Sequence, residues 1–368
     1  MTTDRRHFLA LGGLGVVSVV AGTDHSAVPS RVGQRWTVPS DARRHRRTWM
    51  AWPDSHAIWG RALAGVQHDV ALVARTIAGY EPVVVCANPG AAGHARVLCG
   101  PTVRVITSIP VDDCWMRDTG PVFRISSRGQ VGAVGLGFNG WGGRQTARHD
   151  GQVARAVARR LDLPWVRAGF VGEGGAIETD GRGTVMATLS SLVNPNRNPG
   201  MSAAQVERAV LDAYGATAML WLPGIRGRDI TDDHVDATSR FIRPGVVMVQ
   251  VPPKQRTGIW ARNARRQFHV LSRAHDASGR GLTVIPMAGP RTVRSSSPDF
   301  VDSYVNFAVV NGAVVTAQFG DRDRDRACRA TLSRAFPGRV VVQLDVDRLL
   351  AGGGGIHCIT QHEPAAPR

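Results

Sequence analysis

Five short polar motifs lie along this chain at similar intervals, and their spacing restricts the fold more than any other feature. They are centred on Asp118, Glu173, Asp236, Tyr304 and Cys358, which are 55, 63, 68 and 54 residues apart. Each interval is long enough for roughly one helix and two or three strands. A unit repeated at such a period predicts a ring of about five units, each of which sends one motif to a common centre.

The hydrophobic pattern within these intervals alternates between helices and strands. Apolar residues at helical spacing predict helices over residues 62–78, 152–161, 203–214, 260–273 and 326–336. Short β-branched runs predict strands over residues 48–53, 82–86, 103–107, 131–136, 184–188, 246–251, 282–286, 308–316 and 340–344. No long linker interrupts this alternation, so we expect a single α/β domain.

Arginine dominates the charge of the chain. Among its 368 residues, 45 Lys+Arg stand against 29 Asp+Glu, which gives a formal net charge of +16, and Lys254 is the single lysine. The arginines are spread along the sequence, whereas a specific nucleic-acid binder usually gathers basic residues on one helix or arm. We therefore expect no specific nucleic-acid partner, and a polyanion-binding protein without enzymatic activity is a distant alternative.

The five cysteines are too few and too scattered for a disulfide scaffold or a paired zinc motif. Because their number is odd, at least one thiol stays unpaired in a monomer. The sequence leaves the pairing of four of them open: Cys86, Cys99, Cys114 and Cys328.

The first 27 residues have the pattern of an export signal. Arg5 and Arg6 form a twin-arginine start, an apolar stretch follows over residues 9–21, and small residues suited to cleavage come next. The stretch is shorter than the ~20 residues that span a bilayer, so we expect no stable membrane span. We predict a signal at 1–27 with an uncertain cleavage site, a polar link at 28–46, and a secreted protein (periplasmic or extracellular) that uses the twin-arginine export machinery.

Cys358 is the candidate nucleophile. It follows four consecutive glycines, where another group can approach the backbone closely, although taken singly it fits a buried structural cysteine equally well. A thiolate needs a positive field or a proton acceptor, and His234 is the candidate acid and base. His357 adjoins Cys358, but neighbouring side chains on a strand point to opposite faces, so we do not expect it to serve.

Three carboxylates complete the predicted site. Asp118, Glu173 and Asp236 each lie in a short polar motif, and singly each would fit an ordinary turn. If the three converge on Cys358, the pocket suits a planar cation. Guanidinium fits because it offers paired N–H donors to carboxylates, and its charge would stabilise the thiolate.

At these residues the chain resembles the agmatine deiminase family, within the guanidine-modifying enzymes that also include bacterial peptidyl-arginine deiminases. The resemblance covers essentially residues 47–364, the expected catalytic domain. It rests on ordered motifs at residues 48–53, 113–121, 138–143, 173–175, 196–199, 234–236, 303–307, 318–321 and 352–361. The chain departs from the family pattern at three positions, which are Asp233, Gly355 and His362.

The resemblance implies a five-bladed, pseudo-symmetric α/β propeller (pentein-like) that forms one domain. It also implies Cys358 as nucleophile, His234 as general acid and base partnered by Glu173, and a site that needs no metal or cofactor. Substrate binding is implied for Asp118 and Asp236, which would grip the guanidinium, and for Trp115, which would line the aliphatic part.

The function expected from the resemblance is hydrolysis of agmatine to N-carbamoylputrescine and ammonia through an amidino-cysteine. The alternative is an exported peptidyl-arginine deiminase that converts arginine to citrulline, because an export signal and a net charge of +16 are unusual for an enzyme of polyamine synthesis. A metal hydrolase built on neighbouring residues is a third class: Asp232, Asp233, His234 and Asp236. The sequence does not predict the oligomeric state.

Overall fold

The computed structural model describes residues 34–367, and the predicted export signal over residues 1–27 lies outside this part of the chain. Residues 34–46, expected as part of a polar link, take part in the fold. Here β1 (Trp36–Thr37) pairs with β5 (Val122–Ser126), and β2 (His45–Ala51) begins before the expected domain boundary. None of the helices within residues 34–367 combines the length and the apolar character needed to cross a membrane.

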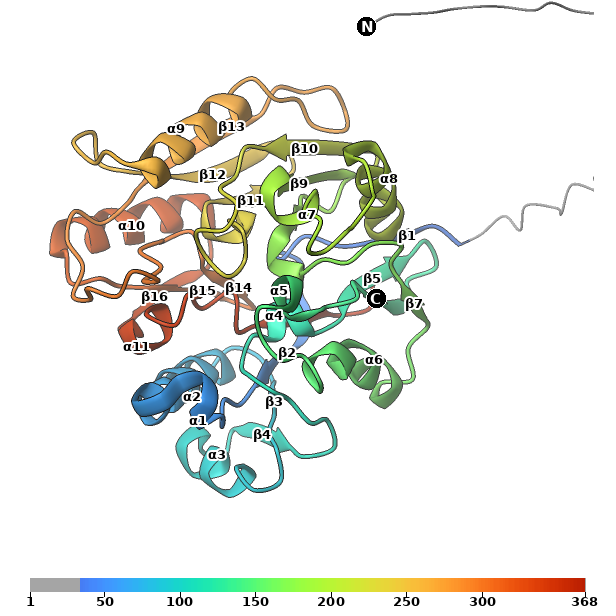
Figure 1. Cartoon of the computed structure of the whole chain (residues 1–368), viewed down its shortest axis with the longest axis vertical. Coiled ribbons are helices and arrows are strands. Elements are labelled where there is room, and N and C mark those ends of the chain that lie inside the picture. The colour runs from blue at the N-terminus through green and yellow to red at the C-terminus, as the bar shows by residue number, and fades with distance from the viewer. Residues whose placement is uncertain (1–33, 368) are drawn as a thin grey trace, which may run out of the picture. The chain divides into compact units, whose positions relative to one another are not determined.

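Within these residues the strands form five sheets (Figure 1). The first two have the orders β1–β5–β6 (Val131–Gly135)–β7 (Trp165–Arg167) and β10 (Ala218–Leu222)–β9 (Thr184–Thr188)–β8 (Ile177–Thr179). The next two have the orders β11 (Ser239–Arg243)–β12 (Val246–Val251)–β13 (Thr283–Ala288) and β14 (Ala308–Val310)–β15 (Ala313–Ala317)–β16 (Val340–Leu344). The fifth combines early and late strands in the order β17 (Gln361–Pro364)–β2–β3 (Val83–Cys86)–β4 (Val103–Ile106).

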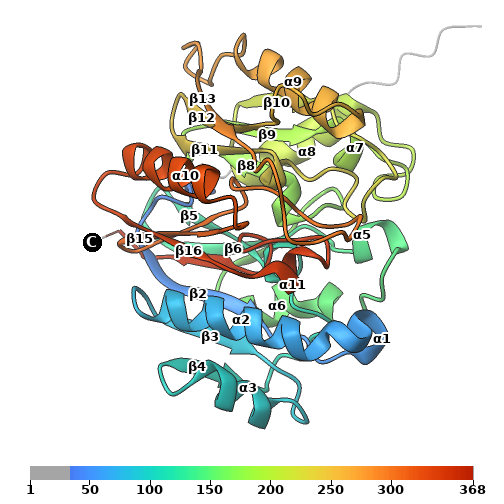
Figure 2. The same cartoon turned by 90° about the vertical axis from the view of Figure 1, so that its left-hand side faces the viewer.

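The five sheets share one pairing pattern. In each, an antiparallel pair is followed by a parallel pair: β5–β6–β7, β8–β9–β10, β11–β12–β13, β14–β15–β16 and β17–β2–β3. Parallel neighbours need a crossover, and a helix supplies it in every case. These helices are α6 (Asp150–Arg160), α8 (Ala203–Tyr214), α9 (Ile259–Leu271), α10 (Arg322–Ala335) and α2 (Leu63–Ala78). Figure 2 shows α2 lying across the sheet that contains β3.

The remaining helices are short. They are α1 (His56–Trp59), α3 (Ala92–Cys99), α4 (Met116–Thr119), α5 (Gly140–Gly143), α7 (Leu189–Leu192) and α11 (Asp347–Leu350), with 3-10 turns η1 (Gly60–Ala62), η2 (Gly174–Ala176) and η3 (Val235–Ala237). α4, η2 and η3 follow one another in contact and carry three of the polar motifs.

Local signals explain why several predicted elements match the structure closely. The predicted helix over residues 203–214 is α8, which starts with a capping box between Ser202 and Gln205 and ends at Gly215 in the left-handed conformation. The predicted strand over residues 308–316 is instead a hairpin of β14 and β15. Asn311 and Gly312, with φ +84° at the glycine, form the turn between them.

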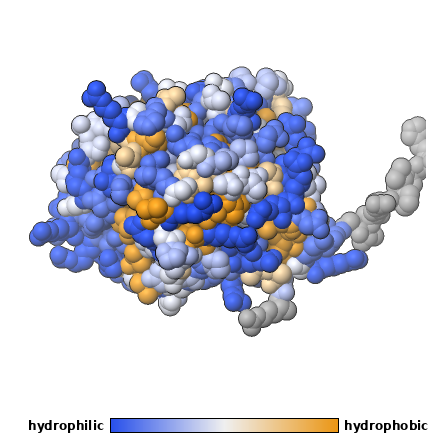
Figure 3. Space-filling model, turned by 90° about the horizontal axis from the view of Figure 1, so that it is seen from below, coloured by the Kyte–Doolittle hydropathy of each residue, from blue (hydrophilic) through white to orange (hydrophobic). Residues whose placement is uncertain are grey.

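The surface of the described residues exposes large apolar side chains in small, scattered groups. Seen from below, hydrophobic residues lie in small groups among hydrophilic ones (Figure 3). The exposed large apolar residues come from many elements: Ile58, Val97, Val166, Leu189, Ile259, Trp260, Val270 and Val340. Scattered groups of this kind are normal for a globular protein.

Candidate active site

The five polar motifs occupy equivalent places in the five sheets. α4 comes just before β5, η2 before β8 and η3 before β11, while residues 303–307 precede β14 and residues 352–360 precede β17. Each motif therefore lies at the start of the first strand of its repeated unit. This equivalence explains how segments more than 50 residues apart can reach one centre, as α4 and η2 do by contact.

Gly175 marks the point where three of the predicted site residues meet. A Cβ atom at this position would lie 2.8 Å from Asp118 Oδ1, 2.9 Å from His234 Nδ1 and 3.0 Å from Asp236 Oδ2. Because glycine has no Cβ, these three polar atoms can pack close to its backbone. Two carboxylates and the imidazole of His234 therefore meet beside Gly175.

The Cys358 thiol belongs to the same cluster. Its Sγ lies 3.6 Å from Asp236 Oδ2, and Asn306 Nδ2 donates to it at 3.3 Å. Burial, followed by the charges of Asp236 and Asp118, raises the pKa of the Cys358 thiol well above its usual value. Without a bound cation the thiol is therefore protonated at neutral pH.

His234 is buried between two acids. Its Nε2 lies 3.3 Å from Glu173 Oε2, and its Nδ1 lies 3.8 Å from Asp118 Oδ2. Burial lowers the pKa of His234, but the negative charges of Asp118 and Glu173 together outweigh burial and raise it to about 9. The imidazole therefore carries a proton at neutral pH and can act first as an acid.

Asp118 and Asp236 are each oriented by contacts with other protein groups. Asp118 accepts hydrogen bonds from Trp141 Nε1 and from the backbone N–H of Gly175, both at 2.9 Å. Asp236 Oδ2 lies 2.7 Å from His357 Nδ1, whereas Oδ1 is buried and has no hydrogen-bond partner within residues 34–367. A buried carboxylate oxygen without a partner is costly, so this atom is ready to accept from a bound donor.

A cavity of about 370 Å³ leads to Cys358 and Asp118. Its walls include Trp59, Trp141 and Trp115, the residue expected to line the aliphatic part of a substrate. Trp115 packs directly against the glycine run, because a Cβ at Gly354 would lie 2.3 Å from its ring. The structure thus places all six predicted site residues in or beside one region.

The sequence profile of the Porphyromonas-type peptidyl-arginine deiminase family matches residues 37–364. The chain belongs to this family. Among its relatives, an agmatine deiminase of Pseudomonas aeruginosa is 38% identical over 353 residues, which cover 89% of this chain and 95% of the relative. A Stutzerimonas stutzeri agmatine deiminase is 37% identical over 353 residues, again with 89% and 95% coverage. The resemblance inferred from the motifs is confirmed.

A solved family structure has the same mixed α/β fold. The agmatine deiminase of Enterococcus faecalis superposes with a TM-score of 0.84 at 29% identity, over 90% of this chain and 98% of that one. The mixed α/β class predicted from the sequence is therefore correct for this deiminase family member.

Two residues of the site were missed by sequence reasoning. The fourth motif was centred on Tyr304, but the Tyr304 hydroxyl donates to Asp325 at 2.7 Å, and Asn306 is the residue that contacts Cys358. Gly355 leaves room for Asn306, since a Cβ there would lie 2.5 Å from Asn306 Oδ1. The motif at residues 303–307 indicates that a site residue lies in this segment. Only the three-dimensional structure shows that Asn306, and not Tyr304, faces Cys358.

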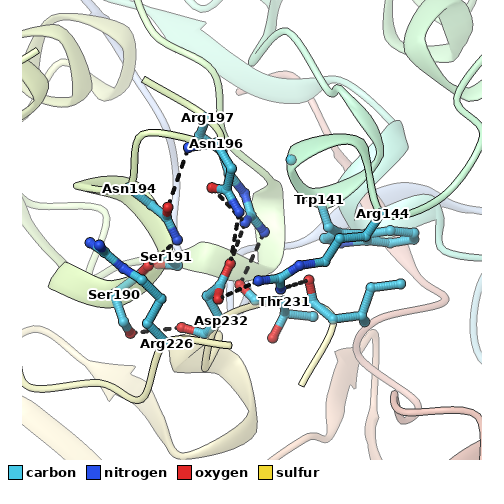
Figure 4. Close-up of polar contacts among 12 residues, drawn as sticks. Trp141, Arg144, Ser190, Ser191, Asn194, Asn196, Arg197, Arg226, Thr231 and Asp232 are labelled. Carbon is cyan, nitrogen blue, oxygen red and sulfur yellow. Dashed lines mark hydrogen bonds and ion pairs between the residues drawn. The ribbon is translucent and has the colours of Figure 1, made fainter. Parts of the chain in front are cut away.

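The second missed residue, Arg197, fixes Glu173. Its Nε donates to Glu173 Oε1 at 3.0 Å, and its Nη1 donates to Asp232 (Figure 4). Burial raises the pKa of Glu173, but His234 and Arg197 outweigh burial and lower it. Glu173 therefore stays ionised beside His234.

The residues of the metal-hydrolase alternative do not converge. Asp232 accepts from Arg144 at 2.8 Å, from Arg197 and from the backbone of Gly227 (Figure 4). Asp233 instead accepts from Asn263 at 2.7 Å. With these two carboxylates turned to separate partners, the four residues do not form a ligand set around His234.

Within residues 34–367 two other groups bring acids and histidines together, namely His45–Glu81–His362 and Asp41–Glu178–His357. The rings of His45 and His362 stack with centroids 4.3 Å apart and an interplanar angle of 9°, so their in-plane lone pairs do not point at one ion. In the second group Arg240 already lies against Asp41 and Glu178. Arg240 therefore neutralises the second group, whereas in the first group Nε2 of His362 is buried without a hydrogen-bond partner among the described residues.

Proposed function

We propose that this protein hydrolyses agmatine to N-carbamoylputrescine and ammonia through a covalent amidino-cysteine. The family relatives support the substrate, because agmatine deiminases match nearly the whole of the described chain. The observation that carries the proposal is the convergence of Asp118, His234 and Asp236 beside Cys358, so close together that a Cβ at Gly175 would lie within 3.0 Å of an atom from each of the three. A guanidinium in the cavity that leads to Cys358 would give N–H donors to both carboxylates.

Binding of the cation prepares the thiol. The acids that raise the pKa of Cys358 are neutralised when a guanidinium lies between them, so its pKa falls and the thiol proton leaves to solvent. The thiolate is thus formed only beside its target. The cavity lined by Trp115 and Trp59 would hold the four-carbon chain of agmatine.

The first half of the reaction ends with release of ammonia. The Cys358 thiolate attacks the guanidinium carbon and forms a tetrahedral adduct. The protonated His234 imidazole gives its proton to one amino nitrogen, which leaves as ammonia, and an amidino group remains on sulfur. Glu173, held ionised by Arg197, stabilises the imidazolium before this transfer.

The second half returns the enzyme to its starting state. Neutral His234 takes a proton from a water molecule, and the resulting hydroxide attacks the amidino carbon. The second tetrahedral adduct collapses by breaking the C–S bond, and the proton of its hydroxyl group passes through solvent to the departing sulfur. The ureido product leaves, Cys358 is again a thiol and His234 is again protonated. None of these steps calls for a metal or an organic cofactor.

A substrate panel tests the proposal directly. Purified protein should release ammonia from agmatine with a kcat/KM at least about 100-fold above that for free arginine or for arginine inside a peptide, because the pocket must reject their carboxylate or peptide groups. N-carbamoylputrescine should form in equal amount. A preference for peptidyl arginine, with citrulline as product, would replace agmatine as the substrate.

Gly175→Ala should displace the groups that hold the guanidinium. The backbone of Gly175 lies outside the left-handed region, so alanine can adopt it, but the new methyl group would fall within 3.0 Å of three site atoms. We expect kcat/KM for agmatine to fall at least about 100-fold through displaced reacting groups, and overpacking of these buried groups should also lower thermal stability. Gly281→Ala is the matched control, since no heavy atom lies within 4 Å of its added Cβ. Equal activity of the two variants would place the guanidinium elsewhere.

The pH profile should report His234. Ammonia release needs the protonated imidazole, so kcat/KM should fall as pH rises above about 9, the pKa of His234 in the free protein. Glu173 contributes to this raised pKa, so Glu173→Gln should move the alkaline limb to lower pH and also reduce the rate. If the alkaline limb of kcat/KM does not move in Glu173→Gln, the limb reports the titration of a group other than His234.

Two further features of the sequence prediction belong to the proposal. The repeated sheet pattern supports a five-bladed pseudo-symmetric propeller, with one polar motif per blade facing the centre. The Arg5–Arg6 pair supports export by the twin-arginine route. A reporter fused behind residues 1–33 should leave the cytoplasm, and substitution of both arginines by lysine should retain it.

A further inference from the structure

Asp41 contacts two arginines and one histidine that adjoin residues of the proposed site. Its Oδ2 accepts from Arg240 Nη2 at 2.8 Å, lies 3.0 Å from His357 Nε2 and accepts from Arg117 Nη2 at 3.5 Å. It comes from the segment between β1 and β2, which sequence reasoning treated as a link. Its three partners are buried, while the Asp41 side chain keeps 24% exposure.

Each partner of Asp41 adjoins a residue of the site. Arg117 precedes Asp118, and its backbone N–H donates to the carbonyl oxygen of Cys358 at 3.0 Å. His357 precedes Cys358. Arg240, in β11, donates to the carbonyl oxygen of Phe307, directly after Asn306. One carboxylate therefore connects three of the motifs that build the site.

His357 transmits this contact to Asp236. Its two ring nitrogens face carboxylate oxygens, Asp236 Oδ2 at 2.7 Å and Asp41 Oδ2 at 3.0 Å. With a carboxylate oxygen beside each nitrogen, the orientation of the His357 ring is fixed at both ends. With Oδ2 held in this way, Asp236 presents its other oxygen, Oδ1, without a protein partner.

We infer that Asp41 and His357 are positioning residues that orient Asp236 for the guanidinium. The inference rests on the proposed function, in which Asp236 grips the cation. Neither residue touches the substrate; Asp41 fixes the His357 ring, and the ring fixes the Asp236 carboxylate. Mutation of residues that orient a binding side chain in this way often lowers affinity or activity by about 10- to 100-fold.

A double-mutant cycle tests the inference. Asp41→Asn should lower kcat/KM for agmatine by about 10- to 100-fold in the wild-type background and, because it acts through Asp236, by less than about 3-fold in the Asp236→Asn background. An equal loss in both backgrounds would overturn it, as would no loss in the wild type. His357→Gln should show the same non-additivity and serves if Asp41→Asn does not fold.

Glu81→Gln is the matched control. Glu81 is a buried carboxylate paired with His45 at 3.1 Å and does not touch the site. Its loss should reduce stability but leave the kcat/KM of the folded protein unchanged. A drop equal to that of Asp41→Asn would show a general effect of removing a buried carboxylate and would overturn the inference.

A binding measurement separates this inference from the proposed reaction. Guanidinium chloride at millimolar concentration should change the rate at which iodoacetamide alkylates Cys358 in the wild type, and Asp41→Asn should raise the half-saturating concentration of guanidinium about 10-fold or more. If the wild type turns over no guanidine but shows this difference, the proposed function fails and the positioning role stands. If turnover is normal and the half-saturating concentrations are equal, the positioning role fails alone.

Discussion

Cys358→Ser should reduce the turnover of agmatine by at least about 10,000-fold, because removal of a covalent nucleophile eliminates the two-step route. Serine keeps the size of the side chain, but its hydroxyl ionises far less readily than a thiol next to a bound cation. In the wild type, rapid quenching during turnover should reveal a chain with the mass of an added amidino group on Cys358. The serine variant should show no such species.

Cys99→Ser is the control for the nucleophile. Cys99 ends α3 in the hydrophobic core, is fully buried, and its pKa is raised to about 11 by burial. Its replacement should cost stability without changing kcat/KM, whereas Cys358→Ser should keep stability and lose the reaction. Residual activity of Cys358→Ser within about tenfold of the wild type would exclude a cysteine nucleophile.

The fold was predictable from the sequence to the extent that local signals determine it. Strands over residues 184–188, 246–251 and 340–344 match β9, β12 and β16 because each is rich in β-branched and apolar residues. Short antiparallel pairs were harder. The run over residues 308–316 reads as one strand unless Asn311-Gly312 is recognised as a hairpin turn, which divides it into β14 and β15.

The candidate site was predictable for residues whose own side chains take part in the chemistry. Cys358, His234 and the three carboxylates can be selected by composition and spacing, and the structure brings them together. Residues that act through others give no such signal. Arg197 is one of 44 arginines, and Asp41 lies in a polar segment without a motif, so only tertiary contacts reveal what they hold.

His357 shows the limit of local patterns. Strand alternation was the basis for expecting its side chain to point away from the thiol of Cys358, but residues 356–359 form a turn before β17, and both ring nitrogens lie against carboxylates. The same rule could not identify those carboxylates. They come from residues 121 and 316 positions away in the sequence, a separation that local patterns do not encode.

Asp236→Asn should change two rates in opposite directions. Loss of its carboxylate removes a charge-assisted contact to the guanidinium, and breaking such a buried pair costs about 3–5 kcal/mol, so kcat/KM for agmatine should fall by roughly 10²- to 10³-fold or more. Asp236 also raises the pKa of the Cys358 thiol, after burial. Its neutralisation should lower that pKa, and iodoacetamide should therefore alkylate the free variant faster than the free wild type at neutral pH.

Asp276→Asn removes a carboxylate that pairs with Arg280 on a distant loop, and it should change neither rate. The opposite signs separate electrostatics from misfolding, because a collapsed site would lose turnover without making the thiol selectively more reactive. Slower alkylation of Asp236→Asn would mean that Asp236 does not control the thiol through its charge. Unchanged turnover would mean that other groups hold the guanidinium and that the carboxylates beside Gly175 do not bind it.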